Sequence, residues 1–310
     1  MLAHSEISNK RPHNIDTNNH GFAEFIRTFS VSTPQISLEY EEDTSLLWIT
    51  LRPEPKPIFT LGLIESVHRV QSSLSQFGSM DSGPLYLAYR TSGPFFSMGG
   101  DLDYYLDCLA KNDRSGLRRY ARLAADVVWN NMSGINGRIV TLATVAGKAL
   151  GGGIDPARAC NVMIAEEAAT FCYPEVNYNH FPITATPVLC RRVPALVAQQ
   201  ILTSGETYTA AEFAGFNLLD AVVPLGTGED WIRSYTKSNA PRQRAMAGLF
   251  SALTRDSGNW QERLEAAADA WVDHMFHLRP IEISKLQRIA LAQERVLARQ
   301  AAPLTVWPQK

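Results

Sequence analysis

Cysteine is scarce in this chain: its 310 residues include four, and no two of them have CxxC spacing. Zinc and redox sites use cysteines at such close spacing, so we expect these four to be reduced, buried, small apolar side chains. His274 and His277 have ligand-like spacing, but the sequence offers them no third ligand. The sequence therefore predicts neither a metal nor a cofactor.

An excess of charge of one sign and long apolar runs are also missing. The net charge is −2, and no basic stripe indicates a nucleic-acid partner. No apolar run is long enough to cross a bilayer, so we expect no membrane association. The first residues lack the apolar core of a secretory signal, and we therefore expect a cytoplasmic protein.

The composition is that of an ordinary globular protein, 45% hydrophobic and 19% charged. Sequence patterns typical of strands stop after about Pro224. Apolar strands alternate with amphipathic helices before that point, which indicates the α/β class with a largely parallel sheet. We expect a mobile polar extension over 1–32, an α/β core over 33–235 and a helical region over 236–310. Helices are predicted over residues 63–74, 103–111, 117–137, 243–253, 261–276 and 281–300.

The most informative motif is Leu150-Gly151-Gly152-Gly153, which directly follows the apolar run 139–146. Three glycines are a poor choice inside a strand or helix, but they let a ligand approach the backbone without meeting a Cβ. A strand, a glycine turn and a helix place free N–H groups at a helix start. Such groups can hold a phosphate or the oxyanion of a reacting carbonyl, although an ordinary strand–helix connection has the same pattern.

A second turn of this kind lies upstream. The apolar run 85–89 is followed by Met98-Gly99-Gly100-Asp101, and Asp101 is a suitable N-cap for the helix after it. Two such turns can each give one N–H to the same oxygen. A third segment, Phe171–Pro182, contains Glu175 after a proline and between apolar residues, so we expect burial to raise its pKa.

The order of these motifs resembles the crotonase, or enoyl-CoA hydratase/isomerase, superfamily over residues 45–235. The resemblance rests on F-S-M-G-G-D-L, A-G-K-A-L-G-G-G-I-D, Y-P-E-V and the segment Ser204–Pro224. Within the superfamily, L-L-W-I, R-P-E-P and the G-G-D-L and A-L-G-G-G turns resemble synthases of diffusible signal factors. This implies a crotonase-like ββα spiral core at 33–235, C-terminal helices as lid and oligomer contacts, and a homo-oligomer, a trimer or hexamer.

The resemblance also implies the site residues. The oxyanion hole falls on the N–H groups of Met98 and Gly152, the two catalytic carboxylates fall on Glu175 and Asp155, and the neighbouring turn glycines contact the substrate. Asp155 departs from the family, which has glutamate there. Because Asp155 precedes Pro156, it can instead be a helix cap with no catalytic task. The turn glycines that the resemblance places against the substrate are Gly99, Gly100 and Gly151.

Two further assignments concern the substrate pocket. Tyr104, Tyr105 and Leu106 follow the first turn and can line an acyl tunnel in helical phase, or they can be ordinary core. His180 can reach the same cleft, but we expect a loop histidine that is hydrogen-bonded to backbone.

The implied activity is dehydration of a 3-hydroxyacyl thioester, with thioester hydrolysis that releases a 2-unsaturated fatty acid signal. The partner is acyl carrier protein or CoA. Apart from Arg90, no basic cluster precedes the first turn to bind nucleotide phosphates, which favours the carrier protein. A CoA-linked hydratase or isomerase of fatty-acid metabolism and a catalytically reduced acyl-binding member remain alternatives.

Overall fold

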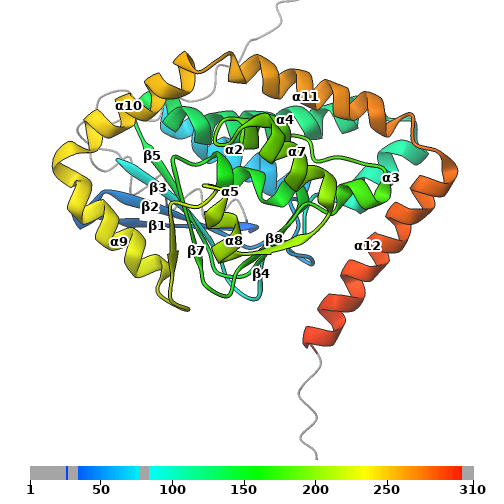
Figure 1. Ribbon diagram of the computed structural model, residues 1–310, viewed down its shortest axis with the longest axis horizontal. Coiled ribbons are helices and arrows are strands. Elements are labelled where there is room, and N and C mark those ends of the chain that lie inside the picture. Colours follow the sequence, from blue (N-terminus) through cyan, green and yellow to red (C-terminus); the bar gives the residue numbers. More distant parts are fainter. Residues whose placement is uncertain (1–25, 27–33, 77–83, 302–310) are drawn as a thin grey trace, which may run out of the picture.

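The computed structural model describes residue 26 and residues 34–76 and 84–301, so nearly all of the predicted extension at 1–32 lies outside the described residues. The main sheet has six strands in the order β1-β2-β3-β5-β7-β10 (Figure 1). All its neighbouring strands are parallel except β1 and β2, which confirms the predicted α/β class. The strands are β1 (Ile36–Glu41), β2 (Leu46–Leu51), β3 (Tyr86–Thr91), β5 (Val140–Val145), β7 (Val162–Glu166) and β10 (Ala221–Val223).

A second, four-stranded sheet carries the glycine turns. Its order is β4-β6-β8-β9, and each strand is three residues long. Because β4 and β6 pair in parallel, the turns that follow them emerge at the same edge. These strands are too short to show a periodicity, and the sequence did not predict them. They are β4 (Phe95–Ser97), β6 (Lys148–Leu150), β8 (Thr170–Cys172) and β9 (Thr207–Thr209).

Strand β2 shows why the main sheet is stable. All six of its side chains are buried, and the five apolar ones alternate between two hydrophobic clusters. Leu47 and Ile49 join the larger cluster beneath α2 (Leu61–Gln76) and α4 (Arg114–Gly137), because alternate side chains point to opposite faces of a strand. Leu46 and Trp48 join the smaller cluster, which includes residues of α9 (Gly228–Asn239) and α10 (Gln243–Asp256).

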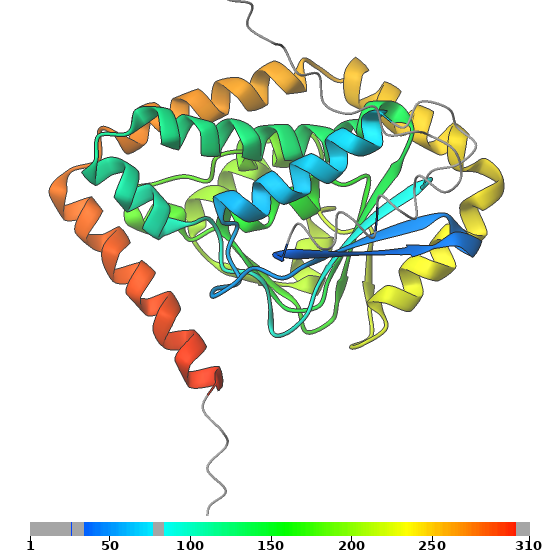
Figure 2. The same cartoon turned by 180° about the vertical axis from the view of Figure 1, so that it is seen from behind.

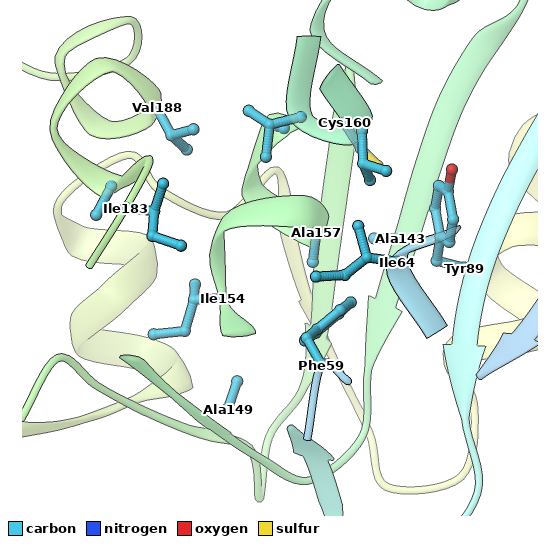
Figure 3. Close-up of a cluster of buried hydrophobic side chains, with 14 of the residues drawn as sticks. Phe59, Ile64, Tyr89, Ala143, Ala149, Ile154, Ala157, Cys160, Ile183 and Val188 are labelled. Carbon is cyan, nitrogen blue, oxygen red and sulfur yellow. The ribbon is translucent and has the colours of Figure 1, made fainter. Parts of the chain in front are cut away.

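The larger cluster also forms part of a cavity wall. Figure 3 shows a portion of it, in which Phe59, Ile64 and Ile183 are among the buried side chains. The same three residues line the cavity that is described below. The remaining helices are α3 (Leu102–Ala110), α5 (Asp155–Ala159), α6 (Ala185–Cys190), α7 (Ala195–Ser204), α8 (Ala210–Gly215), α11 (Trp260–Met275) and α12 (Pro280–Ala301), with short 3-10 helices η1 (Glu42–Thr44), η2 (Gly151–Gly153), η3 (Glu175–Tyr178) and η4 (Ala240–Arg242).

The three helices predicted at 243–253, 261–276 and 281–300 are confirmed within a few residues. Helices α10 and α11 pack along α4, and α12 then turns back to contact α3 and η3 (Figures 1 and 2). Across the described residues, no helix has both the length and the apolarity that a membrane span requires. Helix α12 brings Gln293 to the first glycine turn, where it contacts Met98.

Candidate functional site

A cavity of about 260 Å³ lies where the two glycine turns meet the Glu175 segment and helices α2, α4, α11 and α12. Most of its walls are apolar side chains, and Asp155, Glu175 and Gln293 are among the polar residues that line it. The structure brings seven of the predicted site residues to this one cavity. These are Met98, Gly99, Gly100, Gly151, Gly152, Asp155 and Glu175.

Glu175 is held against the second glycine turn. It is the first residue of η3, and its Oε1 accepts a hydrogen bond of 2.8 Å from the N–H of Gly152. Its Oε2 is buried and has no hydrogen-bond partner among the residues that the structure describes. Burial raises the pKa of Glu175 to about 8, although the Gly152 N–H opposes this shift. The expected raised pKa is thus present, and its main cause is desolvation.

Gly151 makes this close approach possible. Its φ is +55°, a conformation that L side chains rarely adopt. A Cβ on Gly151 would stand 2.2 Å from Oε1 of Glu175, which is far inside van der Waals contact. Glycine is therefore required here both by the backbone and by the carboxyl group.

Both predicted oxyanion-hole donors have acceptors within the protein. The N–H of Met98 donates to the carbonyl oxygen of Pro57 at 2.6 Å, and the N–H of Gly152 donates to Glu175 at 2.8 Å. Buried N–H groups are nearly always paired, so these acceptors satisfy them while no ligand is bound. The carbonyl oxygen of Met98 in turn accepts from Nε2 of Gln293 on α12, at 3.1 Å.

Asp155 is fully buried, and both its carboxyl oxygens accept hydrogen bonds from hydroxyl groups. Tyr173 donates to Oδ1 at 2.8 Å, and Thr184 donates to Oδ2 at 2.7 Å. Burial raises the pKa of Asp155 to about 7, and these two hydrogen bonds partly offset that rise. Asp155 is the first residue of α5 rather than its N-cap, which is Ile154. The capping alternative is therefore wrong.

These two raised pKa values predict how stability depends on pH. A carboxyl group whose pKa is higher in the folded state stabilises the fold below its unfolded pKa, and that contribution is lost as the pH rises through the folded value. For Asp155 this window runs from 3.8 to about 7. Between pH 5 and pH 8, the free energy of unfolding of the wild type should fall as Asp155 ionises. For Asp155→Asn we expect this fall to be roughly 1–3 kcal/mol smaller.

Urea unfolding of both proteins at pH 5 and pH 8 measures this difference. Burial lowers the pKa of His180 to about 3, so this residue makes the free energy of unfolding rise with pH below pH 6.5. Both proteins share this contribution, and the difference between them therefore isolates Asp155. Equal changes in the two proteins would contradict a raised pKa at Asp155.

The prediction for Tyr104 and Leu106 needs a correction. Helix α3 turns Leu102 and Tyr105 towards the cavity, three residues apart, and neither Tyr104 nor Leu106 is among its lining residues. The ring of Tyr104 stacks on Tyr120 instead, with centroids 5.8 Å apart. Of the three residues, Tyr105 alone lines the cavity.

His180 also differs from expectation. The imidazole is 8% exposed and lines the cavity, and its Nδ1 finds no hydrogen-bond partner in the described part of the chain. Its ring lies 6.5 Å from that of Tyr105 and 5.8 Å from that of Trp271, between centroids. It is therefore not the backbone-bonded loop histidine that we expected.

The C-terminal helices supply cavity residues that the sequence reasoning missed. Trp271 comes from α11, and α12 contributes an apolar stripe with Gln293. The two helices also hold the segment between Glu175 and His180, because Nε2 of His274 bonds the carbonyl oxygen of Asn179 at 2.8 Å. Asn179 Nδ2 donates to Oε1 of Glu282 on α12, also at 2.8 Å. Amphipathic periodicity predicted these helices, but it could not indicate which surface they cover.

Comparison with known proteins identifies the family. The model of the enoyl-CoA hydratase/isomerase family matches residues 89–282. The mitochondrial enoyl-CoA hydratase domain-containing protein 3 of Mus musculus is 25% identical over 223 residues, which cover 72% of this chain and 71% of that protein. The probable enoyl-CoA hydratase echA8 of Mycobacterium bovis is 35% identical over 132 residues, 42% of this chain and 49% of the relative.

Solved structures agree on the fold. The enoyl-CoA hydratase of Bacillus halodurans superimposes with a TM-score of 0.70 at 21% identity, covering 82% of this chain and 99% of the other. The match to the family model spans more than half of the sequence and includes both glycine turns and Glu175. This chain belongs to the enoyl-CoA hydratase/isomerase family.

Proposed function

We propose that this protein dehydrates a 3-hydroxyacyl thioester of acyl carrier protein and then hydrolyses the thioester, releasing a 2-unsaturated fatty acid. The observation that carries the proposal is the carboxyl group of Glu175, which sits on the Gly152 N–H in a largely apolar cavity and has a pKa raised to about 8. A pKa near the working pH suits a group that must both take and give a proton.

In the proposed mechanism, the thioester oxygen replaces the present acceptors at the N–H groups of Met98 and Gly152. These donors stabilise the enolate that forms when the C2 proton moves to a carboxylate. The C3 hydroxyl leaves as water once it has been protonated, so the acid and base forms of a carboxyl group are both needed. With pKa values raised to about 8 and about 7, Glu175 and Asp155 can supply both forms near neutrality.

The two carboxyl groups have different freedom to act. Both oxygens of Asp155 are engaged by Tyr173 and Thr184, whereas Oε2 of Glu175 has no partner within the described residues. We therefore assign the proton transfers at the substrate to Glu175, which takes the C2 proton and then gives it to the departing C3 hydroxyl, while Asp155 stays hydrogen-bonded to Tyr173 and Thr184. In the second step, a carboxylate takes a proton from water as the water oxygen attacks the thioester carbon, and the same hole holds the tetrahedral oxyanion. The bond to sulfur then breaks, the proton passes to the departing thiolate, and the carrier thiol leaves as the fatty acid forms.

The carrier protein is proposed over CoA because Arg90 and Lys56, two basic side chains that precede the first turn, are already paired. Arg90 binds Glu39 at 2.5 Å and Glu229 at 2.7 Å. Lys56 is 6% exposed and pairs with Asp103 on α3 and Glu294 on α12. Neither cation is free to meet a nucleotide phosphate. The second candidate, a CoA-linked hydratase or isomerase, is favoured by the relatives, which are named as enoyl-CoA hydratases.

Self-association into a trimer or hexamer is part of the proposal. Leu249 and Leu253 lie one turn apart on α10 and are 58% and 57% exposed, an apolar surface that suits a subunit interface. Helix α12 serves as a lid of its own chain, since its Leu286 and Gln293 line the cavity.

Mass spectrometry of reactions with 3-hydroxyacyl thioesters of eight to fourteen carbons, on carrier protein and on CoA, tests the proposal. We expect a free 2-enoic acid from the carrier thioester. An enoyl product that stays on CoA would move the protein to the metabolic hydratases. Binding of both thioesters without turnover would assign it as an acyl-binding member.

A further inference from the structure

His180 and Glu175 enter the cavity from the two ends of one tight turn. The backbone N–H of His180 donates to the carbonyl oxygen of Glu175 at 3.2 Å, and both side chains line the cavity. A ligand that fills the cavity can therefore meet both side chains. The ring is neutral, because burial and the nearby His274 lower the pKa of His180 to about 3.

Two neighbouring rings of the cavity wall each have a polar nitrogen without a partner in the described part of the chain. Nδ1 of His180 and Nε1 of Trp271 are both buried, and within the described ranges neither has a hydrogen bond. Their rings lie 5.8 Å apart, between centroids, and both line the cavity. Leaving such groups unpaired is destabilising, and native structures rarely keep them without a reason.

The chemistry of the two nitrogens selects the group that would satisfy them. An indole N–H only donates, while a neutral imidazole offers one donor and one acceptor. A hydroxyl group both accepts and donates, so a single hydroxyl oxygen can accept from Trp271 and donate to His180. The nearby hydroxyl of Tyr105 does not fill this role, because it is hydrogen-bonded to Tyr120.

We propose that His180, with Trp271, recognises the C3 hydroxyl of the acyl chain and so selects 3-hydroxyacyl thioesters over saturated ones. This inference rests on the proposed function, since it takes its substrate class from there. His180 is a specificity-determining residue: it holds the hydroxyl beside Glu175, and the proton transfers stay with the carboxyl groups. The proposal explains why a buried imidazole without a partner for Nδ1 among the described residues is kept in the cavity wall.

Binding of two matched ligands tests the proposal without turnover. The probes are 3-hydroxyoctanoyl and octanoyl pantetheine in which a stable amide replaces the thioester. The wild type should bind the hydroxylated probe about 10- to 100-fold more tightly, because the analogue without the hydroxyl leaves buried polar groups unpaired. His180→Leu should bind both probes equally within about twofold, and His180→Asn should restore part of the preference.

Two further variants separate recognition from structural damage. Trp271→Phe keeps an aromatic ring without the N–H and should reduce the preference, whereas the exposed His277, changed to leucine, should behave as the wild type. A preference that survives His180→Leu, or a wild type that binds both probes alike, would overturn the inference. Hydroxyl preference without release of an enoic acid would overturn the proposed function alone.

Discussion

Glu175→Gln lowers turnover of the acyl thioester by about 10³-fold or more and leaves the fold in place. Glutamine has nearly the same shape, and its side-chain oxygen can still accept from the N–H of Gly152, as Glu175 does at 2.8 Å. It cannot take or give a proton near neutral pH, so the chemical step is lost. Steady-state kinetics on the carrier thioester measure the effect.

Although Glu175→Gln should lose activity, it should not lose stability at high pH. The pKa of Glu175 is raised from 4.5 to about 8, so ionisation of this residue destabilises the fold as the pH rises through that range. Glutamine has no such penalty, and the melting temperature of the variant at pH 8 should equal or exceed that of the wild type. Glu206→Gln, at an exposed position, is the matched control. Unchanged turnover in Glu175→Gln would show that another group is the base.

Gly151→Ala removes activity by a different route. Its Cβ would stand 2.2 Å from Oε1 of Glu175, and the backbone at φ +55° is strained for alanine. Moving the carboxyl group by about 1 Å can lower the rate by about 10²-fold, and the strained backbone destabilises the fold by about 1–2 kcal/mol. Kinetics together with urea unfolding measure both losses.

Gly152→Ala is the matched control for the loss of stability. The nearest side-chain atoms to its added Cβ are 3.7 Å and 3.9 Å away, which is ordinary contact, and its φ lies outside the left-handed region. We expect its unfolding free energy to stay within about 0.5 kcal/mol of the wild type. If Gly151→Ala unfolds like Gly152→Ala and keeps the wild-type kcat, the close approach of Glu175 has no functional role.

The elements that sequence predicted well are those with a local signal. The helix expected at 63–74 is observed at Leu61–Gln76, and its apolar positions Ile64, Val67 and Val70 are all buried. The glycine turns were also visible locally, since each follows an apolar run and precedes a helix. Their meeting in one cavity followed from the order of motifs rather than from either turn alone.

The elements that sequence missed depend on partners far along the chain. An Asp-Pro pair has the same local pattern in a helix cap and in this site. The groups that decide between them, Tyr173 and Thr184, lie 18 and 29 residues beyond Asp155. Gln293 bonds Met98 across 195 residues, and no periodicity of a helix specifies such a contact. For the same reason the sequence did not indicate which face of α3 points to the cavity. The packed structure shows that this face carries Tyr105 and not Tyr104.

The hydrogen bond between Glu175 and Gly152 means that a side chain of the protein competes with the substrate for one N–H group. One N–H faces two acceptors, the side chain of the enzyme and, in the proposed mechanism, the oxygen of the thioester. An ionised carboxylate holds the N–H more strongly than a protonated one, so the thioester displaces it more easily when Glu175 carries a proton. Proton binding and substrate binding then reinforce each other, and affinity for the thioester declines as the pH passes about 8.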